Sequence, residues 1–170
     1  MHTSAPRMFR AVLTLSSLLF AAAAAATEPR VEQPAAPALP DPAATAAVAT
    51  AEQFHNALQR GQGEAALQLL DPAVQIYEAG HVERGRDEYA ASHLAADMSY
   101  ARTAQATVKS RKAEVAGDLA WVASESEVQS ERQGKPVKLA SLETLVLKNT
   151  AQGWRIVHIH WSSRELKPTP

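Results

Sequence analysis

The stretch GWRIVHIHWS, residues 153–162, decides the fold. It follows the Gln152-Gly153 turn and predicts a closing strand over residues 154–163. Side chains two positions apart share a face of a strand, at a spacing of about 7 Å. One face is therefore predicted to carry Ile156, His158, His160 and Ser162. The opposite face is predicted to carry Arg155, Val157, Ile159 and Trp161.

Further strands are predicted upstream of this stretch. Three long ones span residues 104–115, 119–132 and 137–148, and the segments 117–118 and 133–136 contain glycine and separate them as turns. Before them, residues 74–78 and 81–84 form a predicted hairpin around Ala79-Gly80.

Three helices complete the prediction. Residues 46–58 place apolar side chains at intervals of three and four before Gly61, and residues 64–70 form a second helix that Asp71-Pro72 ends. A third helix is predicted over residues 86–99. The order ααββαββββ groups helices against a sheet of consecutive strands, which defines an α+β fold.

The N-terminus predicts export. Arg7 and Arg10 precede a largely apolar stretch over residues 11–26 that ends in alanines, as in a secretory signal peptide. This stretch is shorter than the roughly 20 residues that a membrane-spanning helix needs, so we expect cleavage near residue 26. The chain has no cysteine that could carry a lipid. A periplasmic or secreted protein without membrane attachment is expected.

Residues 27–44 are rich in proline and alanine and are predicted to form a flexible tether. Residues 45–166 then form one domain, and residues 167–170 are a short tail. Because the chain contains no cysteine, disulfides and thiolate sites are excluded. Seventeen basic and eighteen acidic residues nearly cancel, which argues against nucleic acid as a partner.

Four segments, residues 54–58, 70–74, 83–89 and 153–162, carry a resemblance to a known family. In this order they resemble the nuclear transport factor 2-like superfamily, in the SnoaL-like branch that includes ketosteroid isomerase relatives. The resemblance implies a cystatin-like fold in which a curved antiparallel sheet wraps around a helix, here the third. It also implies a cone-shaped cavity and a homodimer paired through the sheet. It implies no single reaction, because one fold hosts many chemistries.

The predicted third helix carries Tyr89, His93 and Asp97 at intervals of four residues. Such residues share one helix face, so the carboxylate can orient the imidazole. Catalytic roles are predicted for His93 and Asp97, and ligand binding for Tyr89. The alternative is a solvated polar stripe.

The remaining candidates lie on strands. His158 and His160 are predicted as catalytic residues, with hydrogen-bonded residues at a rim or dimer interface as the alternative. Tyr77 and Glu78 are predicted ligand-binding residues, and His81 and Glu83 are further candidates. If these segments converge, the site suits either acid–base chemistry or a divalent metal such as zinc or copper. The predicted metal ligands are His93, His158 and His160.

Three functions remain open on these residues. The first is an exported pocket protein that binds a small molecule or ion. The second is an acid–base enzyme, of the isomerase or lyase type, acting on a small carbonyl or hydroxylated compound. The third is a dimeric accessory protein without catalysis.

Overall fold

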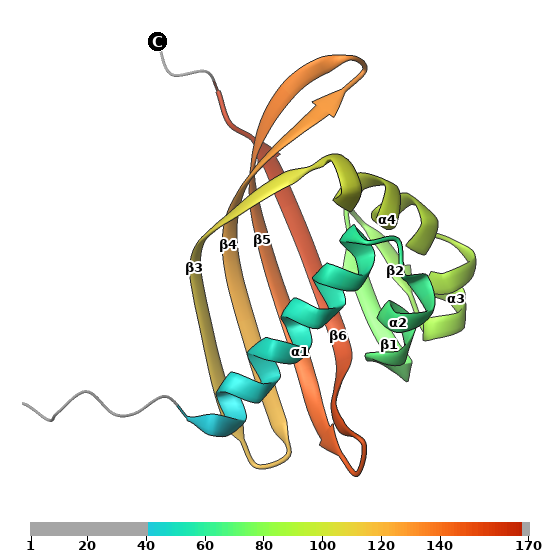
Figure 1. Ribbon diagram of the computed structural model, residues 1–170, viewed down its shortest axis with the longest axis vertical. Helices are drawn as coiled ribbons and strands as arrows, with labels where there is room; N and C mark the ends of the chain where they lie inside the picture. The colour runs from blue at the N-terminus through green and yellow to red at the C-terminus, as the bar shows by residue number, and fades with distance from the viewer. Residues whose placement is uncertain (1–40, 168–170) are drawn as a thin grey trace, which may run out of the picture. The chain divides into compact units, whose positions relative to one another are not determined.

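The computed structural model describes residues 41–167, which form four helices and six strands. The helices are α1 (Pro42–Gln59), α2 (Gly63–Gln68), α3 (Arg86–Ala91) and α4 (Leu94–Thr103). The strands are β1 (Leu70–Glu78), β2 (His81–Glu83), β3 (Gln105–Ala116), β4 (Leu119–Arg132), β5 (Lys135–Thr150) and β6 (Gly153–Glu165). They form one curved sheet in the order β2-β1-β6-β5-β4-β3, which confirms the predicted α+β fold (Figure 1).

The sheet is antiparallel except at one place. β1 and β6 pair in parallel, which corrects the expectation of a wholly antiparallel sheet. Neighbours along the chain can pair through a hairpin, and such pairs are antiparallel. The connection between β1 and β6 instead contains two helices and four strands, so β6 can return in the direction of β1.

The helix α1 lies across the concave face of the sheet and contacts β3, β4 and β6 (Figure 1). It begins inside the segment predicted as a tether, because the Asp41 carboxylate accepts a hydrogen bond from the Ala43 amide and Pro42 starts the first turn. Its apolar face, which includes Ala47, Ala51 and Phe54, is fully buried against the sheet. The helix that the sheet curves around is therefore α1 and not the predicted third helix.

The predicted third helix is two helices. α3 ends at Ala91 and α4 begins at Leu94, with Ser92 and His93 between them. The Ser92 hydroxyl donates to the Glu88 carbonyl oxygen at 2.8 Å, so a side chain competes with the helical backbone pattern there. The break turns His93 toward the β1–β2 hairpin, where its ring contacts Glu83.

A bulge in β6 changes the predicted faces of the closing strand. His158 pairs with Val146, but Ile156 pairs with Leu147, so Val157 is an extra residue. Ile156 and Ile159 are consequently both fully buried. The predicted grouping of Ile156 with the two histidines is wrong, because the alternation restarts after the bulge.

The predicted signal peptide, residues 1–26, lies outside the described residues, as do most of the predicted tether and the last three residues of the tail. Within residues 41–167, no helix combines the length and the hydropathy that crossing a membrane requires.

Candidate functional site

A row of mostly polar side chains crosses the sheet on the face that α1 covers. Strand pairing places its members side by side from β2 to β3, in the order His81, Glu78, Trp161, Glu143, Ser124 and Arg111. The neighbouring row on the same face contains Ile76, Ile159, Leu145 and Val122, all at most 1% exposed. The polar row therefore borders the apolar core of the domain.

At the α1 side of this row, Glu143 is held by two donors. Its Oε2 atom lies 2.6 Å from Nε2 of His55, which comes from α1, and accepts a hydrogen bond from the Trp161 indole at 2.7 Å. Burial alone would raise the pKa of Glu143, but these two hydrogen bonds and the charge of Arg111 outweigh it and hold the pKa below its usual value. We call His55, Glu143 and Trp161 the paired cluster.

Neighbouring side chains complete the paired cluster. The ring of Phe54 stacks on Trp161, with centroids 6.3 Å apart. The Arg111 guanidinium donates to Glu52 on α1 at 2.7 Å and to the Ser124 hydroxyl at 3.0 Å. Each charged group here has an opposite charge or a hydrogen-bond partner, so this end of the row fastens α1 to the sheet.

At the other end of the row lie three carboxylates and a histidine. Glu78 and Glu83 come from the β1–β2 hairpin, and His93 and Asp97 come from the start of α4. Nδ1 of His93 contacts the buried Glu83 carboxylate, and the hydroxyl of the fully buried Tyr89 donates to Asp97 at 2.7 Å. We call Glu78, Glu83, His93 and Asp97 the acidic cluster.

The pKa values of Glu78, His93 and Asp97 shift upward. Burial, followed by the charge of Asp97, raises the pKa of Glu78. Burial also raises the pKa of Asp97, although the hydrogen bond from Tyr89 and the charge of His93 oppose it. The hydrogen bond to Glu83 raises the pKa of His93. Glu78 and Asp97 therefore hold protons more readily than ordinary carboxylates, which suits them to proton exchange.

The structure brings together four of the predicted site residues: Glu78, Tyr89, His93 and Asp97. Their partners differ from the prediction, because Asp97 bonds Tyr89 while His93 pairs with Glu83. His81 lies beside them, with its ring centroid 5.7 Å from that of His93. The break between α3 and α4 explains this change, because His93 no longer continues the helical row.

The other predicted site residues lie on the opposite, outer face of the sheet. Tyr77 alternates with the buried Ile76, and its ring meets the edge of His158 at a centroid distance of 4.9 Å. His160 pairs with Tyr77 in the register and is exposed. The structure thus does not join His93 to His158 or His160. No three His, Asp or Glu side chains among residues 41–167 are arranged to hold a metal ion.

The paired cluster was not predicted from the sequence. Glu143 stands two and four residues before Leu145 and Leu147, so an acid occupies the buried face of an otherwise apolar strand. That pattern marks a carboxylate in need of a partner. Its partner His55 is 88 residues away in the chain, and no local pattern in the sequence indicates that the two residues pair.

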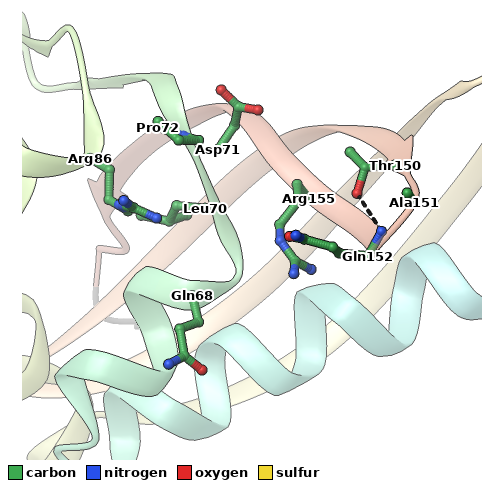
Figure 2. Close-up of a pocket in the computed structure, with 9 residues that line it drawn as sticks. All are labelled: Gln68, Leu70, Asp71, Pro72, Arg86, Thr150, Ala151, Gln152 and Arg155. Carbon is green, nitrogen blue, oxygen red and sulfur yellow. Dashed lines mark hydrogen bonds between the residues drawn. The ribbon is translucent and has the colours of Figure 1, made fainter.

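A groove of about 570 Å³ lies at the start of β1, away from the acidic cluster at its end (Figure 2). It contains no member of either cluster. The groove is lined by Gln68, Leu70, Asp71, Pro72, Arg86, Thr150, Ala151, Gln152 and Arg155.

The model of the SnoaL-like domain family matches residues 48–164. The chain belongs to the SnoaL-like family. Among solved structures, this SnoaL-like domain is similar to a provisionally assigned ketosteroid isomerase from Shewanella frigidimarina. The two are 43% identical, the match covers 71% of this chain and 98% of that one, and the TM-score is 0.67.

Other solved structures share the fold of the SnoaL-like domain. The CaMKII hub of S. rosetta is 25% identical, with 76% of this chain and all of that one covered and a TM-score of 0.63. A provisionally assigned dehydratase of the nuclear transport factor 2-like family from Streptomyces avermitilis is 23% identical, with 74% and 99% covered and a TM-score of 0.63, and shows the fold alone. No curated protein matches the chain.

Proposed function

We propose that the acidic cluster binds a small carbonyl or hydroxylated compound and exchanges a proton with it. The observation that carries this proposal is the pair of half-buried carboxyl groups, Glu78 and Asp97, whose pKa values both lie above their usual values. After burial, the negative charge of Asp97 raises the pKa of Glu78, and the negative charge of Glu83 raises the pKa of both groups, so one proton tends to stay on the pair.

A shared proton gives the two carboxyl groups different roles. The protonated group donates a hydrogen bond to a carbonyl oxygen, while the ionised group accepts a proton from the ligand. Tyr89 fixes Asp97 from the buried side, and Glu83 fixes His93 beside the pair. The provisional assignment of the Shewanella relative as a ketosteroid isomerase is consistent with proton transfer next to a carbonyl group.

The test uses two β,γ-unsaturated ketones, a 3-ketosteroid and 3-cyclohexenone, as probes. Conversion to the conjugated ketone is followed by ultraviolet absorbance, and binding by the NMR shifts of the Glu78 and Asp97 carboxyl groups. We expect Glu78→Gln to lower turnover about 100-fold or more, because an amide cannot accept the proton. Glu125→Gln, an exposed change on the outer face of β4, is the matched control and keeps turnover.

Shifts confined to residues outside the acidic cluster would contradict the proposal. Binding without conversion would leave the domain as a pocket protein, and saturable shifts at Glu78 and Asp97 would then identify the site.

We also propose that the mature protein is an exported dimer paired through the outer face of the sheet. On this face Tyr77 is 40% exposed and Leu142 is 54% exposed, which is unusual for large apolar side chains on a sheet. Leu142→Glu is expected to yield a monomer in light scattering, with Glu64→Gln, an exposed change on α2 away from the outer face of the sheet, as the control. Sequencing the N-terminus of the protein from culture medium and periplasm tests export; a chain retaining residues 1–26 would contradict it.

A further inference from the structure

The groove at the start of β1 brings together three distant segments of the chain. The end of α2 and the start of β1 form one wall, the first residue of α3 contributes Arg86, and the β5–β6 turn contributes Thr150 and Gln152 (Figure 2). The Thr150 hydroxyl accepts a hydrogen bond from the Gln152 amide at 3.1 Å, which shapes the turn. Figure 2 shows Arg155 and Gln152 next to each other, with Arg86 reaching toward Leu70.

The groove is lined by more positive than negative side chains. Its lining contains two guanidinium groups, Arg86 and Arg155, and a single carboxylate, Asp71. One oxygen of that carboxylate already accepts the backbone N–H of Ala73 at 2.8 Å. The groove is therefore positive, in a chain whose formal net charge is −1.

The guanidinium groups have few partners among the described residues. Arg155 donates one hydrogen bond, to the carbonyl oxygen of Trp154 at 3.1 Å. The nearest carboxylate to Arg86 belongs to Asp87, at 4.0 Å, which is beyond hydrogen-bond distance. A guanidinium has five N–H donors in a planar fork, so most of those of Arg155 are available to a ligand.

A second groove, of about 410 Å³, shares Gln68 and Arg155 with the first and adds Arg60, the residue that follows α1. Arg155 is thus reached from two sides, and it is only half-exposed. Partial burial strengthens a charge-assisted hydrogen bond, because fewer water molecules compete for the donor. The amide side chains of Gln68 and Gln152 supply further neutral donors to the same space.

We propose that this groove binds a small oxyanion, a carboxylate or a phosphate, on the guanidinium of Arg155, with Arg86 as the second positive charge. Planar bidentate binding of carboxylate and phosphate is the geometry that arginine favours. The groove lies at the start of β1, whereas Glu78 stands at the end of that strand, and no member of the acidic cluster lines the groove. The anion site is therefore separate from the acidic cluster.

The experiment titrates the full chain with inorganic phosphate and, separately, with succinate, each against sodium chloride at constant ionic strength. NMR follows the Arg155 Nε–H and the backbone amides of Leu70 and Gln152. We expect saturable shifts at these groups with at least one of the two anions, and none with chloride. The anion that binds more tightly shows whether the natural ligand carries a phosphate or a carboxylate group.

Three variants locate the binding. Arg155→Gln is expected to weaken the anion about tenfold or more, because it removes a charge-assisted fork of hydrogen bonds. Arg155→Lys keeps the charge and the fold but loses the fork, so it is expected to bind with intermediate affinity. Arg164→Gln, an exposed change on the same strand outside the groove, is the matched control and leaves affinity unchanged.

Two results would overturn the proposal. One is the absence of saturable shifts with both phosphate and succinate. The other is an affinity that Arg155→Gln and Arg155→Lys leave at the level of Arg164→Gln.

Discussion

The paired cluster and the acidic cluster lie on the same face of the same sheet, and their carboxylates behave in opposite ways. In the paired cluster, Glu143 accepts hydrogen bonds from His55 and Trp161, and its pKa falls. In the acidic cluster, Glu78 faces Asp97 and Glu83, and its pKa rises. Trp161 lies between Glu78 and Glu143 in the strand register, so one side chain separates the two environments.

The difference between the clusters separates a structural role from a chemical one. A buried carboxylate with two donors is stable as an anion and fastens one element to another. Carboxylates that repel one another favour the protonated form, which costs stability but keeps a proton on the pair to a higher pH than on ordinary carboxylates. Replacing each glutamate by glutamine should therefore change the free energy of unfolding in opposite directions, down for Glu143 and up for Glu78.

The largest expected loss of stability comes from replacing Trp161, the residue between the two clusters. Trp161→Ala removes the stack on Phe54 and the hydrogen bond to Glu143, and we expect it to lower the free energy of unfolding by about 3 kcal/mol. Trp161→Phe keeps the stack and loses only the hydrogen bond, at a cost of about 1 kcal/mol. Urea denaturation of both variants measures this; equal losses would show that the stack does not hold α1 on the sheet.

An intermediate effect is expected from Glu143→Gln. This change keeps an acceptor but removes the charge that His55 and Trp161 bind, so we expect destabilisation by about 1–2 kcal/mol at pH 7. The folded-state pKa of Glu143 lies below 4.5, so its stabilisation is present above pH 4.5 and is lost as the pH falls through that lowered pKa. Unfolding experiments across the acid range should show the variant and the wild type converging there; a constant difference would contradict the assignment.

The smallest expected effect has the opposite sign. Glu78→Gln removes a charge that Asp97 and Glu83 repel, so we expect a stabilisation of about 0.5 kcal/mol at pH 7, limited by solvent screening of a half-buried group. The folded-state pKa of Glu78 lies above 4.5, so the wild type loses stability as the pH rises through it. The gain should disappear below pH 4.5. If Glu78→Gln instead lowers the free energy of unfolding at pH 7, Glu78 is stabilised as an anion in the same way as Glu143, which would contradict this prediction.

Local patterns in the sequence predicted the elements of the fold. Alternation and turn residues located all six strands, and helical spacing located α1 and α2. Spacing also predicted that Tyr89 and Asp97 lie on one side, and they share a hydrogen bond. Glu78 was predicted from its place on the first hairpin.

Features that depend on distant contacts escaped the sequence analysis. The bulge at Val157 has no glycine or proline to mark it, yet it turns His158 and His160 to the outer face. At the break between α3 and α4, Ser92 and His93 both contact the Glu83 carboxylate of the β1–β2 hairpin, which only the folded chain supplies. His55 and Glu143 meet only because α1 crosses the sheet.

The most direct test of the contrast between the clusters is an NMR titration of the carboxyl carbons of Glu78, Asp97 and Glu143 in the wild-type protein. The account predicts midpoints above 4.5 for Glu78 and above 3.8 for Asp97, and a midpoint below 4.5 for Glu143. Because Glu78 and Asp97 interact, their two midpoints belong to the pair. Midpoints for the pair at or below these ordinary values would remove the basis for proton exchange at the acidic cluster.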